Sequence, residues 1–419
     1  MEKKYELTNI GKIVDGYSVY RIRALRSFSN INKGDLGGWI SKQENLSHEG
    51  NAWVYDDAVV IGGKVYENAK ISNYAIIYNG SIYGNAKIYD SAKVHNEVSI
   101  YDNVEIFGNA KISGSNYNVY GISTKIYGNV RIHGNAKISH ITNKTKGNPD
   151  SIFSIYDNVE IFGDANVEVH VYGGSSGVDD KGHGRNKIYG NTKIFDNASI
   201  IGSDYSFTKP DYSIVGGFEL YDNAKIYGNA KLDGNKLKSY LRIFGNARIY
   251  DKAIISDRST IFDDTKIYGN AKIQGDTQLF GQAEVFGNTQ IQGGTVSQWA
   301  KVHGYAKIQD NVSISGWAEV YGNANITGYT RISGNANILG NAQITKTSDY
   351  FFVSHIGPKD NRLTAFKEGG DSISVFHVDF IGTIEEFENI IKERHKEGKF
   401  RDVYLNQIET IKKQLSEQK

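Results

Sequence analysis

The chain has 419 residues, with 48 Lys and Arg against 47 Asp and Glu, and it contains no cysteine. The balanced charge gives no general attraction to nucleic acid or to acidic lipid, and the lack of cysteine excludes disulfides and Cys-bound metals. Residues 1–20 contain no apolar signal-peptide core, and no run of about 18 apolar residues could span a membrane, so we expect a cytoplasmic protein.

Residues 1–50 are expected to form a small N-terminal β cap. The segment YSVYRIRAL, residues 17–25, alternates as a strand does. The cap precedes a long repeat, and the exposed strand edges at the ends of a repeat stack need such covers to prevent aggregation.

The repeat is six residues long. An aliphatic residue recurs at every sixth position in the segment 82–113, namely at Ile82, Ile88, Val94, Ile100, Ile106 and Ile112. This period matches neither a helix nor a simple alternating strand, but it does match a short strand followed by a corner. In the hexads a Gly-Asn pair such as Gly84-Asn85 supplies the corner, because both residues tolerate a positive φ.

Interruptions of the repeat give the number of hexads in each coil. The longer insertions follow Ile112, Ile138, Val167 and Ile200, and each of these positions ends a third hexad. Residues 51–345 therefore predict an all-β solenoid of triangular cross-section, with about 13–15 coils and the insertions clustered at one corner. We expect residues 140–153, 173–187 and 202–218 to form a crest that is more mobile than the coils.

Residues 346–419 leave the repeat and are expected to form a C-terminal α+β cap. Three strand-like segments read as a β-meander, YFFVSHIG, RLTAFKEG and ISVFHVDFIG. Thr383 and Glu386 form a capping-box signature that predicts a helix through about Arg394, and a second helix is predicted over residues 401–415.

The hexad I-x-G-N-A-x resembles the code of the left-handed β-helix hexapeptide-repeat family, and this resemblance implies the handedness of the coil. Residues 34–58 and 380–395 resemble the ends of phage and prophage hexapeptide-repeat proteins of the YdcK-like type. Many hexapeptide-repeat proteins are acyltransferases, so the resemblance also implies that activity as an alternative.

An acyltransferase of this family would need a histidine base at a corner, beside a groove for an acyl carrier. His95, His133 and His303 directly follow inward aliphatic residues and are expected on the outer flat sides, in structural positions. His183 is a better candidate, because its Gly-rich insertion also contains Arg185, although a flexible polar loop tip is the preferred explanation of both residues. We therefore assign no catalytic residue, no metal ligand and no cofactor, and we favour a non-enzymatic protein.

Aromatic residues follow the inward aliphatic residues on two of the three sides. The first side carries an unbroken series, Tyr66, Tyr83, Tyr101, Tyr127, Tyr156, Tyr189, Tyr221, Phe244, Phe262 and Phe280. The second side carries a similar series interrupted by His133, while the third side is mostly polar. Such aromatic side chains could simply stack to stabilise the sheet. Because they avoid one side, we interpret them instead as a partner surface.

Three functions remain open from the sequence. The preferred one is a rigid, non-enzymatic phage-type solenoid that binds a protein partner, such as a host factor or host defence protein, or a second copy of itself. The alternatives are a hexapeptide-repeat acyltransferase and a carbohydrate-binding solenoid. We predict that the partner contacts Tyr127, Tyr156, Tyr189 and Tyr221, together with His183 and Arg185.

Overall fold

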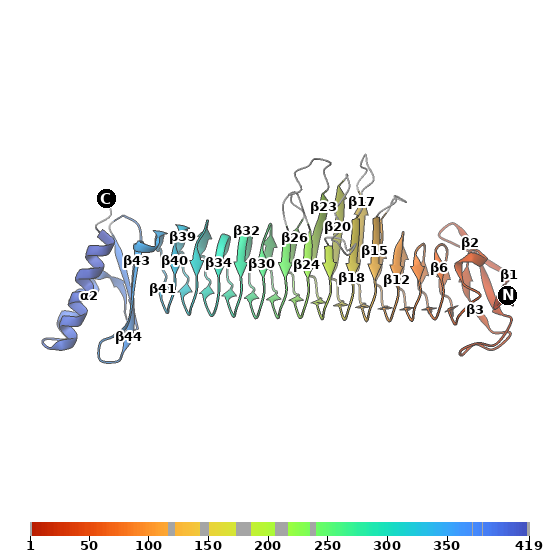
Figure 1. The fold of residues 1–419 in the computed structure, drawn as a ribbon, viewed down its shortest axis with the longest axis horizontal. Coiled ribbons are helices and arrows are strands. Elements are labelled where there is room, and N and C mark those ends of the chain that lie inside the picture. The colour runs from red at the N-terminus through yellow and green to blue at the C-terminus, as the bar shows by residue number, and fades with distance from the viewer. Residues whose placement is uncertain are drawn as a thin grey trace. The chain divides into compact units, whose positions relative to one another are not determined.

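The computed structural model describes residues 2–115, 122–142, 151–172, 186–205, 217–234, 240–370, 372–378 and 380–416. The described chain is mostly β-structure, with long sheets of parallel strands typical of a solenoid (Figure 1). It divides into two compact units, Met1–Gly245 and Asn246–Lys419. The division falls within the predicted repeat region.

Unit 1 begins with a small antiparallel sheet. Strands β1 (Tyr5–Val14) and β2 (Tyr17–Ala24) form a hairpin, and β3 (Leu36–Ile40) pairs with β2. On its other edge β3 pairs in parallel with β5 (Val59–Val60). The strand β3 is therefore the point at which the antiparallel sheet changes into the parallel stack, and it leaves no open edge between them.

A buried lysine ties this sheet to the first repeat. The Lys4 ammonium is buried and donates to the backbone carbonyls of Glu49, Gly50 and Ala52, the last at 2.9 Å. Burial and the nearby Arg26 lower the pKa of Lys4 to about 8. Three carbonyl partners satisfy the donors of a buried ammonium, which would otherwise be costly to remove from water.

In the repeats of unit 1, each strand pairs in parallel with the strand three elements later, so the strands fall into three series. The first series is β6 (Lys64–Val65), β9 (Ser81–Ile82), β12 (Val98–Ile100), β15 (Ile122–Ile126), β18 (Ser151–Ile155), β21 (Asn186–Ile188), β24 (Phe218–Leu220) and β27 (Leu241–Ile243). The second series is β4 (Trp53–Val54), β7 (Lys70–Ile71), β10 (Lys87–Ile88), β13 (Glu105–Ile106), β16 (Arg131–Ile132), β19 (Glu160–Ile161), β22 (Lys193–Ile194) and β25 (Lys225–Ile226). The third series is β5, β8 (Ile76–Ile77), β11 (Lys93–His95), β14 (Lys111–Ser113), β17 (Lys137–Thr142), β20 (Asn166–Tyr172), β23 (Ser199–Tyr205) and β26 (Lys231–Gly234).

The interior of these repeats consists of the aliphatic residues that the six-residue period identifies. Ile88, Ile106, Ile132, Ile161 and Ile194 all have an exposed fraction of 0%. Each of them lies in register with its counterpart in the next coil. Stacking identical positions in this way keeps the interior dry and pairs the strand backbones at the same time.

The insertions produce a second packed region, which we call the insertion lobe. It is formed by the parts of β15, β17, β18, β20, β21, β23 and β24 that extend beyond the two-residue strands of the second series. Its buried side chains include Thr124, His140, Ser151, Phe153, Val169, Val171, Asn186 and Ser203. The strands β17 and β18 run to Thr142 and from Ser151, so strand structure continues into segments expected to be loop. The expected mobility of the remaining insertion residues falls outside the described residues and stays a prediction.

The repeats of unit 2 also pair in parallel from coil to coil, but the step falls to two elements around β32 (Lys272–Leu279) and β34 (Gln290–Val296), because each of these long strands pairs with strands of two series. One series contains β28 (Arg248–Ile249), β31 (Lys266–Ile267), β33 (Glu284–Val285), β35 (Lys301–Val302), β38 (Glu319–Val320) and β41 (Asn337–Ile338). The other strands are β29 (Ile254–Ser256), β30 (Thr260–Ile261), β32 (Lys272–Leu279), β34 (Gln290–Val296), β36 (Lys307–Gln309), β37 (Ser313–Ile314), β39 (Asn325–Tyr329), β40 (Arg331–Ile332) and β42 (Gln343–Lys346).

The C-terminal part of unit 2 is an antiparallel sheet of four strands rather than three. These are β43 (Tyr350–Ile356), β44 (Asn361–Lys367), β45 (Ile373–His377) and β46 (Phe380–Thr383), because the segment expected as one strand turns back on itself. Helices α1 (Ile384–Arg394) and α2 (Lys399–Ser416) follow. Thr383 accepts from the Glu386 backbone and Glu386 from the Thr383 backbone, which is the capping box that the sequence predicts.

Candidate binding surface

The aromatic residues of the first series form a continuous stack in unit 1, which we call the first aromatic column. Neighbouring ring centroids are 4.6–5.0 Å apart, and the ring planes are within 10° of parallel. Its members are Tyr66, Tyr83, Tyr101, Tyr127, Tyr156, Tyr189, Tyr221 and Phe244. All of its tyrosines are half-buried.

This stacking brings four of the predicted partner residues together. Tyr127, Tyr156, Tyr189 and Tyr221 are consecutive members of the column. Both faces of Tyr156 are covered by neighbouring rings, so the column offers ring edges and hydroxyl groups to a partner rather than open faces. A sugar needs an open face to stack on, and this geometry therefore argues against the carbohydrate alternative at these positions. The other two predicted residues, His183 and Arg185, lie outside the described residues.

A polar cluster holds the column at its last coils in unit 1. The Tyr189 hydroxyl donates to Glu219 Oε1 at 3.1 Å, and Arg242 Nη2 donates to the Tyr221 hydroxyl at 3.0 Å. Arg242 also lies 3.4 Å from the other oxygen of the Glu219 carboxylate. Burial, and then the Glu219 carboxylate, raise the pKa of Tyr189. The hydroxyls thus stay protonated at neutral pH and can donate hydrogen bonds.

The strands that carry these tyrosines also build the insertion lobe. In β15 and β18 the N-terminal residues pair within the lobe, and Tyr127 and Tyr156 follow the last residue of each strand. The lobe is connected to the first series by His140, whose ring nitrogens lie 3.0 Å from the Thr124 hydroxyl and 3.1 Å from that of Ser151. The lobe and the first aromatic column are therefore two parts of the same strands.

A second aromatic column follows the second series, and His133 belongs to it. The His133 ring lies parallel to Phe107 at 4.7 Å and to Phe162 at 5.1 Å. The expectation that His133 lies among aromatic neighbours is confirmed, and its flat imidazole continues the column instead of interrupting it. In unit 2, His303 stacks in the same way between Phe286 and Tyr321.

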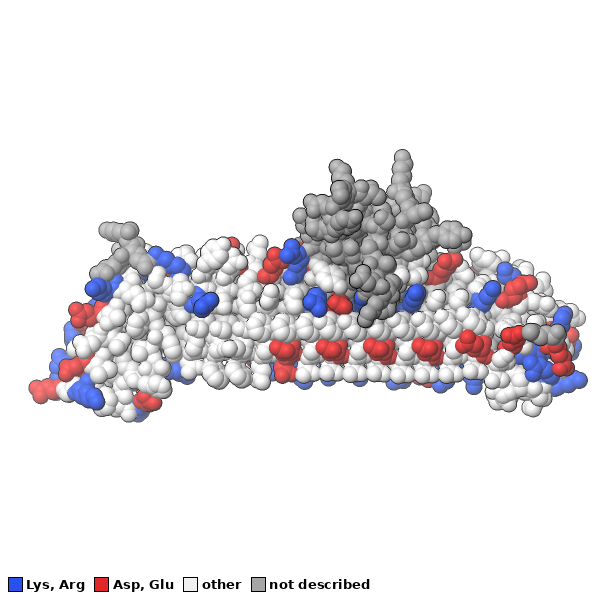
Figure 2. Space-filling model, in the orientation of Figure 1, with Lys and Arg blue, Asp and Glu red and all other residues white. Residues whose placement is uncertain are grey.

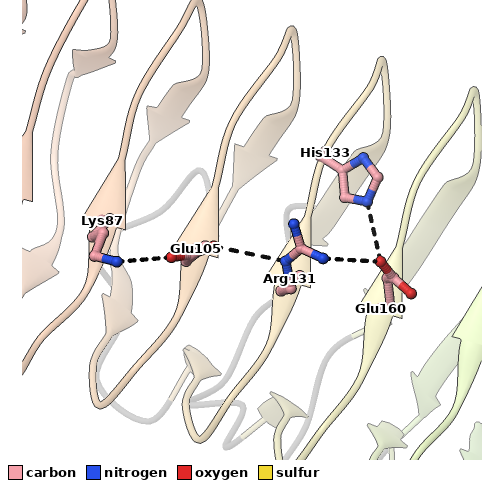
Figure 3. Close-up of polar contacts among 5 residues, drawn as sticks. All are labelled: Lys87, Glu105, Arg131, His133 and Glu160. Atoms are coloured by element: carbon pink, nitrogen blue, oxygen red, sulfur yellow. Dashed lines mark hydrogen bonds and ion pairs between the residues drawn. The ribbon is translucent and has the colours of Figure 1, made fainter.

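A chain of opposite charges runs beside the second column (Figure 3). Lys87 donates to Glu105 at 2.9 Å, and Arg131 lies 3.6 Å from Glu105 and 3.4 Å from Glu160. His133 Nε2 lies 3.4 Å from the same Glu160 carboxylate. Beyond the residues drawn there, the chain continues to Lys193, whose Nζ lies 2.7 Å from Glu160. The hydrogen bond from Lys193 is the main cause that lowers the pKa of Glu160. The charges thus neutralise one another from coil to coil.

The corner between the first and second strand series carries two further series of hydrogen bonds that we did not anticipate. Asparagine amides bond in sequence at 3.0–3.3 Å, through Asn51, Asn68, Asn85, Asn103, Asn129, Asn158, Asn191 and Asn223. The residue before each asparagine alternates between glycine and an acid, and each acid accepts from the next glycine N–H, as in Gly128 to Asp102 and Gly190 to Asp157. Figure 2 shows acidic side chains at regular intervals along one edge of the repeats, as this alternation requires.

The signal for this corner is present in the sequence. The pairs Gly-Asn and Asp-Asn alternate at the start of successive coils, as in Gly84-Asn85, Asp102-Asn103 and Gly128-Asn129. The alternation becomes visible when the corner residues of successive coils are compared two coils at a time. These corner amides and carboxylates are occupied by bonds within the chain, which leaves the ring edges and the insertion lobe as the candidate surface.

A pocket of about 790 Å³ lies in unit 1, beside the N-terminal sheet. It is lined by Gln43, Glu44, Leu46, Ser47, His48, Lys64, Val65, Tyr66 and Ser81. His48 stacks on Tyr5 at 4.5 Å, and its Nδ1 accepts from the Lys4 backbone N–H at 3.2 Å. Nδ1 is therefore unable to act as a base, and the neutral ring carries its proton on Nε2.

The described residues contain neither a metal-binding cluster nor a membrane-spanning helix. No group of three or more His, Asp or Glu side chains in the described part of the chain could hold a metal ion. In that same part, no helix is long and apolar enough to cross a membrane.

No protein-family model matches the chain. A curated relative matches a short stretch, with 41% identity over 46 residues, and is described as an uncharacterized acetyltransferase YdcK of Escherichia coli (strain K12). The match covers 11% of this chain and 14% of the length of that relative. The similarity is local, and acetyl transfer by this chain is therefore a proposal rather than a finding.

Proposed function

We propose that the chain is a left-handed, triangular solenoid of the hexapeptide-repeat type that acts as a rigid, non-enzymatic binding protein for a protein partner. Pairing of each repeat strand of unit 1 with the strand three elements later supports the triangular coil. The left hand and the phage or prophage origin rest on the resemblance of the hexads and the flanking segments. Inhibition of a host factor or host defence is the kind of role that a rigid binding protein of this origin would have.

The observation that carries the proposal is the continuity between the first aromatic column and the insertion lobe. A partner that contacts both would meet stacked rings that have little conformational freedom to lose. Beside these rings it would meet the polar insertion segments. Ring edges that are already fixed reduce the entropy cost of association, and polar insertions adapt to the partner's hydrogen bonds. The interior of the repeats contributes only stiffness.

The test replaces Tyr156 and Tyr189 together by serine. Both rings lie outside the aliphatic interior, so circular dichroism should show that the fold is retained. Pull-down should then recover at least about 10-fold less partner, or light scattering should show loss of self-association, since interface aromatics commonly contribute 1.4 kcal/mol or more.

A matched control is available in the same coils. Phe162 and Phe195 stack in the second aromatic column at 4.9 Å, away from the lobe strands. Their joint replacement by serine should destabilise the stack by a similar amount while leaving partner recovery unchanged. Equal partner recovery by both double variants, with equal losses of thermal stability, would contradict the placement of the surface and leave the column a structural feature.

Acetyl transfer is the second candidate, and the local match to an acetyltransferase favours it. Titration with acetyl-CoA by calorimetry tests it directly. Saturable micromolar binding that disappears in the His183→Ala variant would replace the binding-protein proposal. The His133→Ala variant is the control, because His133 already stacks between two rings and contacts Glu160.

A further inference from the structure

The pocket beside the N-terminal sheet lies at the start of the first aromatic column. Tyr66 lines this pocket and is the first ring of the column. One face of Tyr66 stacks on Tyr83, with a centroid distance of 4.7 Å and an interplanar angle of 10°. The opposite face is directed toward the preceding turn of the chain, where the next ring of the column would otherwise lie.

Ser47 occupies the register of that next ring. The Ser47 N–H donates to the Val65 carbonyl at 2.9 Å, just as the Tyr66 N–H donates to the Ile82 carbonyl at 3.1 Å. The backbone is therefore placed for another aromatic residue, but the side chain is a small hydroxyl. The pocket occupies the space over Tyr66 that this small side chain leaves open.

The surrounding groups can recognise a polar ring. The Ser47 hydroxyl oxygen accepts from the Glu49 N–H at 3.0 Å, so its own hydrogen remains able to donate. His48 Nδ1 is occupied by the Lys4 N–H, and its Nε2–H can donate. Burial, followed by the nearby Lys4 and Lys3, lowers the pKa of His48, which favours this neutral form. Glu44 supplies an acceptor and Lys64 a further donor at the pocket wall.

We propose that this pocket binds a small planar heteroaromatic ring of the nucleobase kind, which stacks on Tyr66 as an additional member of the column. The volume of about 790 Å³ lies within the range of small-molecule sites. A flat ring at about 5 Å from Tyr66 would continue the spacing of the column, and donors and acceptors on its edge would match Ser47, His48 and Glu44. The inference is independent of the proposed protein-binding surface, which lies several coils further along the chain.

The experiment titrates the full chain with three probes, namely adenosine, N-acetyltyrosinamide and methyl β-glucoside, monitored by calorimetry. We expect saturable one-site binding of adenosine, weaker binding of the tyrosine derivative, and the weakest binding of the sugar, whose puckered, hydroxyl-bearing ring stacks less closely on Tyr66 than a flat heteroaromatic ring does. The Tyr66→Leu variant should weaken adenosine binding by about 5- to 150-fold, the range found when one base-stacking aromatic is removed.

The Ser47→Tyr variant separates ligand binding from folding. An added ring should stack on Tyr66 and occupy the site, so adenosine binding should be lost while thermal stability is retained or increased. The Tyr101→Leu variant is the control within the column, and its adenosine affinity should stay within about 2-fold of the unmodified chain. Failure of adenosine to bind, tighter binding of the sugar, or full adenosine affinity in the folded Ser47→Tyr variant would overturn the proposal.

Discussion

The second strand series and the insertion lobe of unit 1 solve the same packing problem in different ways. In the second series the strands are two residues long, and each buries one aliphatic side chain such as Ile161. In the lobe the strands reach seven residues, and they bury large rings such as Phe153 and Phe218 together with the polar His140. The repeat thus needs only two correct residues in each hexad, a small one and an aliphatic one such as Ala86 and Ile88, whereas the lobe needs specific partners for each buried group.

This difference teaches where the molecule can vary. A plain coil tolerates many outward side chains, because its interior is satisfied by a narrow aliphatic column. The lobe combines hydroxyls, an imidazole and aromatic rings that must meet in one geometry, and a polar group left without its partner there costs more than its bond contributes. Substitutions should therefore have local and distinguishable effects in the two regions.

The largest effect is expected from Phe218→Ala. Phe218 is fully buried, and its ring packs edge-on against Phe153 at 6.1 Å. Removing it should cost about 3–5 kcal/mol, because a cavity remains in the lobe. Hydrogen exchange should rise in β18, β21 and β24 while β19 and β22 stay protected. In the Ile161→Ala variant, exchange should instead rise in β19 and β22 while β18, β21 and β24 stay protected. A uniform rise in exchange throughout unit 1 in both variants would show that the two regions do not differ in this way.

A corner substitution, Gly190→Ala, should have the next largest effect. Gly190 has a φ of +70°, and a Cβ atom would lie 2.6 Å from the Asp222 backbone nitrogen. The left-handed conformation alone costs about 1–2 kcal/mol for alanine, and the contact adds to it. Gly16→Ala is the matched control, since Gly16 has a φ of +85° but no atom within 4 Å of an added Cβ. The unfolding temperature should fall more for Gly190→Ala than for Gly16→Ala. Equal decreases in the two variants would mean that the coils move apart to accept the methyl group.

Acid should destabilise the lobe through His140. Burial lowers the pKa of His140 from its usual 6.5 to about 3. The unfolded chain therefore binds a proton below pH 6.5 that the folded lobe excludes, and stability present above pH 6.5 is lost as the pH falls toward 3. The loss approaches about 1.4 kcal/mol per pH unit, or about 2 kcal/mol at pH 5.

The His140→Gln variant tests this pH dependence. Its unfolding free energy should vary less between pH 6.5 and 5 than that of the unmodified chain, since no imidazole titrates in the lobe. His133→Gln serves as the comparison in the second aromatic column, where the ring is partly exposed. A His140→Gln variant with the same acid slope as the unmodified chain would assign the slope to other groups.

The smallest effect is expected from Glu160→Gln in the charge chain of Figure 3. Its partners Arg131 and Lys193 are about half exposed, at 50% and 46%. Pairs of this kind contribute up to about 1 kcal/mol, and salt screens them. The stability loss should shrink between low salt and 1 M salt, as measured by denaturant unfolding. A loss that is independent of salt would mean that Glu160 acts through packing rather than charge.

The sequence predicts the six-residue period, the inward aliphatic residues and the stacked tyrosines, because each depends on a single repeated position. It also contains the alternation of Gly-Asn and Asp-Asn, although this is visible only when coils are compared in pairs. The same regularity accounts for His133, which the sequence places among aromatic neighbours and whose ring continues the second column. Its place in the column depends on the flatness of its ring rather than on its polarity.

Tertiary structure decided the contents of the insertion lobe and the pocket over Tyr66. Nothing local in the sequence joins His140 to Thr124 and Ser151, since the insertions have no period and their partners come from different coils. Likewise, Ser47 takes the register of a ring only because the chain after the N-terminal sheet enters the stack at that level. A repeated position specifies its own neighbours by stacking on itself, whereas a unique residue acquires its neighbours only when the coils close around it.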